Sequence, residues 1–247
     1  MLAIIIPTYN EAGSLPDLLR RLDAAMRAAG AEYEAVVVDD SSPDGTGAMA
    51  EDLARKLPVR VVHRPSKAGL ASAVLDGMGL TGAELVGVMD ADLSHPPETV
   101  PRLVAALERT AAQLAVGSRY VPGGGMEDWP LRRRIVSMVA NWMTRLLLPI
   151  RDATSGFFVI RRDALEGVKL NPIGFKIGLE VMARANYETY VEVPYIFTDR
   201  KHGHSKFGRR EVAAFLKQLG MLYAERLRLR KKWPRAIVPP APERVAA

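Results

Sequence analysis

The chain has 247 residues, of which 48% are hydrophobic and 25% charged, as in an ordinary soluble globular protein, and its length suits one large domain. It contains no cysteine, which excludes a disulfide framework and thiolate chemistry, and it lacks the uninterrupted apolar run of a spanning helix and the basic lead of a secretory signal. The formal net charge of +6 indicates an anionic partner, and a cytoplasmic location is favoured.

The first hundred residues alternate short apolar runs with amphipathic segments. Strands are predicted at residues 2–6, 34–38, 59–63 and 85–89, and helices at 15–26, 46–57, 70–80 and 97–109, with Ser14 as the cap of the first helix. Such alternation predicts βαβ units, and therefore an α/β fold with a mostly parallel sheet and helices on both faces. The polar loops that follow these strands are expected to gather at one edge of the sheet.

Two of these loops carry pairs of carboxylates. Asp90 and Asp92 follow one apolar run, and Asp39 and Asp40 follow another. Carboxylates at a strand end can hold Mg²⁺ or Mn²⁺ beside a substrate diphosphate, while the second pair can recognise a nucleoside. An isolated pair of this spacing is more often only a polar loop, so the pair needs support from the rest of the chain. Asp44, in a Ser-Pro-Asp-Gly turn, is interpreted as a turn cap.

The second half of the chain continues with predicted strands at residues 114–117, 159–160 and 191–198 and helices at 130–149, 174–186 and 210–228. Residues 121–129, with three successive glycines, are predicted to form a flexible loop. Residues 229–247 are basic and proline-rich and are predicted to be a disordered tail, which leaves residues 1–228 as the folded domain.

The segment 130–149 has an apolar arc wider than a surface helix needs, interrupted by a narrow polar stripe. Two interpretations of the arc remain open. It is buried between the sheet and another subunit, or it lies in a membrane interface with the neighbouring arginines near lipid headgroups. The polar stripe consists of Arg134, Ser137, Asn141 and Arg145.

The ordered motifs at residues 5–11, 37–46, 89–97, 117–120, 129–135, 154–157 and 199–206 resemble glycosyltransferase family 2 and, within it, the dolichol-phosphate (polyprenol-phosphate) mannosyltransferases, in a short form without a transmembrane domain. The likeness extends to about residue 223. It implies a GT-A fold, amphipathic interface helices, and metal-dependent, inverting transfer of mannose from GDP-mannose to a polyprenyl phosphate. It also implies a peripheral location on the inner face of the cytoplasmic membrane, with a membrane-anchoring protein partner or a homo-oligomer as a further expectation.

The resemblance also implies roles for individual residues. It assigns nucleoside binding to Pro7, Tyr9, Glu11, Val38 and Asp40. It assigns the diphosphate and metal to Asp90, Ala91 and Asp92, and the contacts with anionic phosphates to Arg119, Arg133, Lys176, Arg200 and Lys206, assisted by Ser205. Of these, Asp92, Arg119, Arg133 and Arg200 are expected to be catalytic. Ser94 stands where some relatives have Gln, whose longer side chain can approach the metal. The shorter Ser94 is therefore expected to be a metal ligand only if its hydroxyl reaches the ion, directly or through water.

Several alternatives stay open at this level. A related enzyme with the same fold could use UDP-glucose or another UDP-sugar, and a catalytically inactive sugar-nucleotide-binding membrane adaptor is the alternative from another class. Nucleic-acid binding rests on net charge alone and is not expected. A zinc site at His202 and His204 would lack sulfur and further nitrogen ligands, so these residues and His95 are interpreted as loop polarity.

Overall fold

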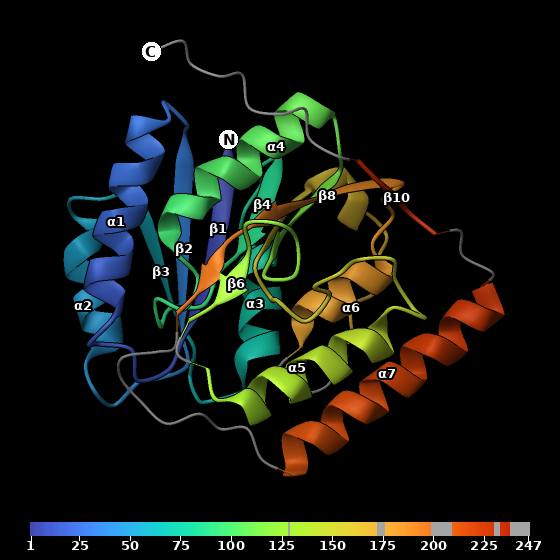
Figure 1. Ribbon diagram of the computed structural model, residues 1–247. Helices are drawn as coiled ribbons and strands as arrows, with labels where there is room; N and C mark the ends of the chain where they lie inside the picture. Colours follow the sequence, from blue (N-terminus) through green and yellow to red (C-terminus); the bar gives the residue numbers. More distant parts are fainter. Residues whose placement is uncertain (128, 172–175, 199–208, 230–232, 238–247) are drawn as a thin grey trace.

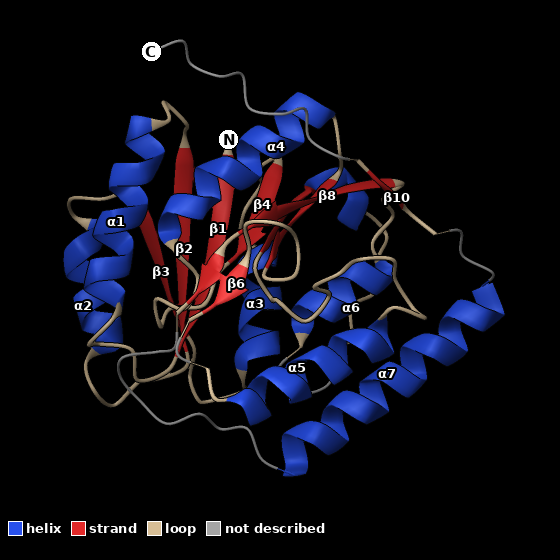
Figure 2. Cartoon of the chain, viewed as in Figure 1, coloured by secondary structure: helices blue, strands red, loops and turns tan. Residues whose placement is uncertain are grey.

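The computed structural model describes residues 1–127, 129–171, 176–198, 209–229 and 233–237. In this part of the chain an eight-stranded sheet forms the centre, in the order β10-β8-β5-β7-β4-β1-β2-β3 (Figures 1 and 2). β7 is antiparallel to both of its neighbours, β4 and β5, and the remaining described pairs of this sheet are parallel, so the prediction of a mostly parallel sheet is confirmed. Its strands are β1 (Leu2–Thr8), β2 (Tyr33–Asp39), β3 (Val59–His63), β4 (Leu85–Val88), β5 (Leu114–Ser118), β7 (Phe158–Arg161), β8 (Thr189–Pro194) and β10 (Arg235–Ala236).

Helices cover both faces of this sheet, as predicted. One hydrophobic cluster joins alternate sheet residues to α1 (Leu15–Ala28), α2 (Thr46–Ala54) and α4 (Val100–Thr110). The opposite cluster joins the other sheet face to α3 (Leu70–Gly79), α6 (Ile177–Arg184) and α7 (Arg209–Leu229). Ile4 belongs to the first cluster and Ile5 to the second, because successive side chains of a strand point to opposite faces.

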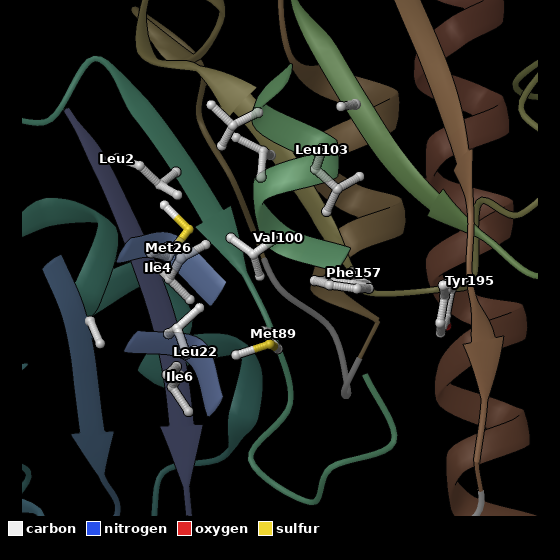
Figure 3. Close-up of a cluster of buried hydrophobic side chains, with 14 of the residues drawn as sticks. Leu2, Ile4, Ile6, Leu22, Met26, Met89, Val100, Leu103, Phe157 and Tyr195 are labelled. Atoms are coloured by element: carbon white, nitrogen blue, oxygen red, sulfur yellow. The ribbon is translucent and has the colours of Figure 1, made fainter. Parts of the chain in front are cut away.

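Helix α1 shows how the sequence pattern produces this packing. Its apolar residues recur at helical spacing and face β1 (Figure 3), where Leu22 and Met26 lie beside Ile4 and are inaccessible to solvent. Ser14 occupies the predicted cap position, but its hydroxyl donates to Glu11 rather than accepting from the helix. Burying an apolar side chain such as that of Leu22 or Met26 stabilises the fold by roughly 1.5–3 kcal/mol relative to leaving it exposed.

Four segments differ from the predictions. The predicted strand 191–198 is interrupted after Pro194, and its end forms β9 (Ile196–Phe197), which pairs with β6 (Gly125–Met126) inside the segment predicted as a flexible loop. The predicted helix 130–149 is regular only over α5 (Leu131–Thr144). Arg235 and Ala236, expected in a disordered tail, pair with β8 and extend the sheet, since the backbone groups of its edge are open to a further strand.

Helices α5 and α7 lie side by side at the periphery (Figure 1), where the hydroxyl of Tyr223 in α7 donates to the carbonyl of Met143 in α5. The apolar arc of α5 is exposed in the single chain. Its exposed large side chains, together with one beyond the helix, are Leu131, Ile135, Val136, Met138, Val139, Trp142 and Leu146. Across the described ranges, we find no helix with the length and apolar character required to cross a bilayer.

Candidate active site

The predicted acid pair lies in the loop directly after β4, where it is held in a defined shape. Asp92 is buried, whereas the side chain of Asp90 is partly exposed. The N–H of Ser94 donates to Asp92 Oδ1 over 3.1 Å, and Leu93 between them has a φ of 64°. A leucine in the left-handed region is strained, so the surrounding contacts must hold this loop in place.

His95 supplies one of these contacts. Its imidazole is buried and stacked on Phe157, with ring centroids 4.7 Å apart, and its Nδ1 accepts the N–H of Asp90 over 3.1 Å. Burial lowers the pKa of His95, and a ring whose Nδ1 is an acceptor carries its proton on Nε2. The interpretation of His95 as loop polarity is therefore wrong, because a neutral, buried imidazole shapes the acid loop instead.

The donor set suits a hard divalent cation. In the described ranges, no three His, Cys, Asp or Glu side chains are grouped to hold a metal. An ion at Asp90 and Asp92 would combine these carboxylates with further oxygen ligands, such as substrate phosphates and water. Mg²⁺ in particular is commonly bound by one or two carboxylates together with phosphates and waters. Ser94 is buried beside the pair, and its role as a ligand stays a prediction.

The predicted nucleoside residues follow β1 and β2 at the same edge. Asp39 is a structural residue, because its carboxylate accepts the hydroxyls of Thr8 and Ser42. Asp40 is buried and held from two directions: Arg64 Nη1 lies 2.6 Å from its Oδ1, and the N–H of Gly69 donates to its Oδ2 over 2.8 Å. A nucleobase that used this carboxylate would meet it already oriented by the loop after β3.

The other nucleoside candidates divide into loop and interior residues. Tyr9 carries the ammonium of Lys67 at 3.4 Å above its ring centroid, and Glu11 accepts the hydroxyl of Ser14. Pro7 and Val38 are buried within β1 and β2, and Ala91 is buried between the two acids of the β4 loop. Asp44 accepts the backbone N–H and hydroxyl of Thr46, so its interpretation as a turn cap is confirmed.

The predicted phosphate ligand Arg119 is buried and engaged within the protein. Its Nε and Nη2 each lie 2.8 Å from one oxygen of Asp152, and its backbone N–H donates to the same carboxylate. Burial alone would raise the pKa of Asp152, but the Arg119 guanidinium holds it below its ordinary range, and both groups stay charged. Arg119 is therefore one half of a buried, bidentate pair, and its contact with a substrate phosphate stays a prediction.

Lys176 and Arg133 surround this pair. Lys176 Nζ donates to the carbonyl of Thr154 over 3.0 Å, and burial together with the neighbouring Arg119 charge lowers its pKa to about 8. Arg133 lies over the ring of Trp129, 4.2 Å from the centroid, and Arg119 is 5.5 Å from the same centroid. Lys176 interacts electrostatically with Asp90 and Arg133 as well, so the structure brings three of the predicted cations together with the acid loop.

The remaining predicted residues, Arg200, Ser205 and Lys206, lie outside the described residues, as do His202 and His204. Two residues of the site were missed by the sequence interpretation. Asp152 pairs with Arg119, and Asn141 donates to Asp152 over 3.3 Å. The signal for Asp152 in the sequence is its place two residues before the start of the 154–157 motif, since it lies 33 positions from Arg119.

The topology explains why these groups meet. β4 and β5 end at the same edge of the sheet as β1 and β2. The antiparallel β7, which lies between β4 and β5, begins at that edge. The loop that carries Asp152 and Thr154 therefore lies between the loops that carry Asp90 and Arg119. Ligands of open α/β sheets bind at such an edge.

This sheet, with an acid pair at its carboxyl edge beside a group of cations, defines the class of GT-A glycosyltransferases. Residues 3–168 match the family described as "Glycosyl transferase family 2", and the chain belongs to this family of enzymes. A solved glucosyl-3-phosphoglycerate synthase from Mycobacterium tuberculosis, in complex with Mg²⁺ and UDP, shares the fold with a TM-score of 0.65 at 19% identity, covering 92% of this chain and 79% of that one.

Curated relatives are more similar in sequence. A dolichol-phosphate mannosyltransferase of Pyrococcus furiosus is 44% identical over 88% of this chain, and a polyprenol monophosphomannose synthase of Mycolicibacterium smegmatis is 45% identical over 82% of it. The match spans 62% of the Pyrococcus protein and 79% of the Mycolicibacterium protein, so this chain corresponds to about three fifths of the longer relative.

Proposed function

We propose that this enzyme transfers mannose from GDP-mannose to the phosphate of a polyprenyl phosphate such as dolichyl phosphate, with inversion, giving polyprenyl-phosphate mannose and GDP. The proposal is carried by one observation: the acid pair, buried Arg119 and half-buried Arg133 and Lys176 share an edge of the sheet with the inner side of α5, whose outer side is apolar. The names of the relatives from Pyrococcus and Mycolicibacterium support the same acceptor class.

The chemistry of the site suits this reaction. A lipid phosphate is already anionic near neutral pH, so its oxygen can attack the anomeric carbon without a dedicated general base. The difficulty is that two anionic substrates must approach one another, and Lys176 and Arg133 are placed to offset their repulsion. Asp90 and Asp92 would hold Mg²⁺ or Mn²⁺, which when bound stabilises charge on the departing diphosphate. Arg119, fixed by Asp152, adds a positive potential that does not need to reorganise.

We further propose that the acceptor stays in the bilayer and that the enzyme docks peripherally on an anionic membrane surface through α5 and α7. The exposed apolar arc of α5 supports this, together with exposed Arg132 and Arg134 near its start and exposed Arg228 in the last turn of α7. Arg226 in the same turn is half-buried. Attachment to the cytoplasmic face follows from the sequence prediction, as does a membrane-anchoring partner or a second copy of the chain.

The decisive experiment offers the protein one polyprenyl phosphate and Mg²⁺ or Mn²⁺ with separately labelled GDP-mannose, UDP-glucose and UDP-N-acetylglucosamine. Label from GDP-mannose alone should enter the lipid fraction. Transfer from a UDP-sugar instead would replace the donor in this proposal, and no transfer from any donor would favour the adaptor alternative.

Asp92→Asn tests the metal assignment. The substitution keeps the shape of the side chain but removes its charge, so metal-dependent turnover should fall at least about a hundredfold. Glu108→Gln, in the exposed part of α4, is the matched control and should retain the wild-type rate. Near-normal turnover of Asp92→Asn would remove Asp92 from the metal site.

A further inference from the structure

Each of the two outward-facing helices carries one buried amide on its inner side. Asn141 of α5 is 4% exposed although Met138 on the same helix is 49% exposed, and Gln218 of α7 is 1% exposed although Leu216 is 47% exposed. A buried amide is costly unless it is hydrogen-bonded, so its partners indicate what it is there to hold.

Asn141 holds the loop that precedes β7. Its Oδ1 accepts the N–H of Thr154 over 3.3 Å, and its Nδ2 donates to Asp152 over the same distance. The carbonyl of Thr154 is in turn the acceptor for Lys176 Nζ. Asn141 therefore fixes the residue that receives the hydrogen bond of the Lys176 ammonium.

Gln218 holds Lys176 from the other side. Its Nε2 donates to the backbone carbonyl of Lys176 over 3.3 Å and to Glu180 Oε2 over 3.0 Å. Glu180 is buried in α6, the helix that begins directly after Lys176, and its other oxygen pairs with Arg184. Gln218 thus fixes the backbone from which the Lys176 side chain extends.

The packing beneath these contacts leaves little room for Lys176 to shift. Gly178 in the first turn of α6 lies so close to the 154–157 loop that an added Cβ would be 3.0 Å from the Cα of Gly156. The start of α6 and the Thr154 loop are therefore in backbone contact. A small movement of α5 or α7 would be transmitted to the Lys176 ammonium.

We propose that Asn141 and Gln218 are positioning residues that couple the seating of α5 and α7 to the placement of Lys176 toward the acceptor phosphate. This inference rests on the proposed function for the identity of the acceptor. Each helix then has a second role besides docking. Asn141 of α5 fixes Thr154, which accepts the hydrogen bond of the Lys176 ammonium, and Gln218 of α7 fixes the backbone of Lys176.

The test is a double-mutant cycle with Lys176. Asn141→Leu and Gln218→Met remove the amides at similar size, and each should lower kcat/KM for the polyprenyl phosphate about tenfold, with less than about a twofold change in KM for the nucleotide sugar. In a Lys176→Met background the same substitutions should change kcat/KM less than about twofold, because the group on which they act is absent.

Matched controls change exposed side chains on the outer sides of the same helices, away from these contacts. Met138→Leu in α5 and Leu216→Met in α7 replace exposed apolar residues with others of similar size. Both should retain kcat/KM within about twofold. Thermal unfolding of every variant identifies any that has lost its fold. If Gln218→Met has lost its fold, Gln218→Asn, with a shorter amide, replaces it.

Additive losses in the Lys176→Met background, or equal losses in the controls, would overturn the coupling.

A parallel measurement separates failure of the coupling from failure of the proposed function. Calorimetric binding of farnesyl phosphate, without donor, should show the same non-additivity in Kd. If the wild type binds farnesyl phosphate but transfers no mannose, the proposed function fails and the coupling is judged from binding. If it neither binds farnesyl phosphate nor transfers mannose to the polyprenyl phosphate, both the proposed function and the coupling are wrong.

Discussion

Helices α1 and α5 have the same length, 14 residues, and are both amphipathic, yet they are oriented in opposite ways. α1 buries its apolar residues, Leu15, Leu18, Leu19, Leu22 and Met26. α5 buries only Asn141 and Thr144 and exposes its apolar arc. The first helix contributes to the core, while the second turns its polar side to the active site. An apolar helix face that points away from the core is explained by a second apolar environment outside the protein, and the proposed environment is a lipid bilayer.

The largest expected effect comes from breaking the buried pair of Arg119 and Asp152, to which Asn141 of α5 donates a further hydrogen bond. Asp152→Asn would leave Arg119 buried without its counter-charge and should lower the free energy of unfolding by about 3–5 kcal/mol, measured by urea denaturation. Asp163→Asn, in the turn after β7, is the control and should change it by less than about 0.5 kcal/mol. A loss below about 1 kcal/mol for Asp152→Asn would mean that the pair is not maintained in solution.

The next effect compares the apolar residues of the two helices directly. Leu22→Ala in α1 should cost about 3 kcal/mol of unfolding free energy because it opens a cavity in the core, whereas Met138→Ala in α5 should cost less than about 0.5 kcal/mol. Equal costs, measured by the same denaturation, would show that the α5 arc is covered in solution, as the alternative of burial against another subunit predicts.

A smaller effect is expected on membrane binding. Trp142 is 68% exposed in the α5 arc, and Trp142→Ala should weaken partitioning into anionic vesicles about tenfold without lowering the unfolding temperature. Leu80→Ala, another exposed apolar position outside α5 and α7, should leave partitioning unchanged. Binding of the wild type should also decrease with added salt, and salt-independent binding would contradict docking through arginines.

The smallest effect concerns pH. The pKa of Lys176 is lowered to about 8, so the ammonium is present below that pH and is lost as the pH rises through it. Between pH 7.5 and 8.5 the charged fraction falls about threefold, and kcat/KM for the acceptor should fall with it. Lys176→Arg, which stays charged, should flatten this limb of the profile. An unchanged profile in that variant would assign the limb to another group.

Much of this molecule could be predicted from consecutive residues. The 3.6-residue and two-residue periods located most helices and strands, because each period reflects a face that must be buried. The acid pair was found because it ends an apolar run. The split after Pro194 and the strand at Arg235 were missed, since both depend on which backbone groups a distant neighbour leaves open.

The sequence by itself determined the alternation of strands and helices, the resemblance to glycosyltransferase family 2, and the positions of Asp90, Asp92 and the candidate cations. Only the tertiary structure decided that Arg119 is paired with Asp152, that His95 is buried, and that α5 turns Asn141 inward. The physical reason is that a period identifies two faces of a helix but not what each will contact. That choice is made where β7 enters between β4 and β5 and brings its preceding loop to the site.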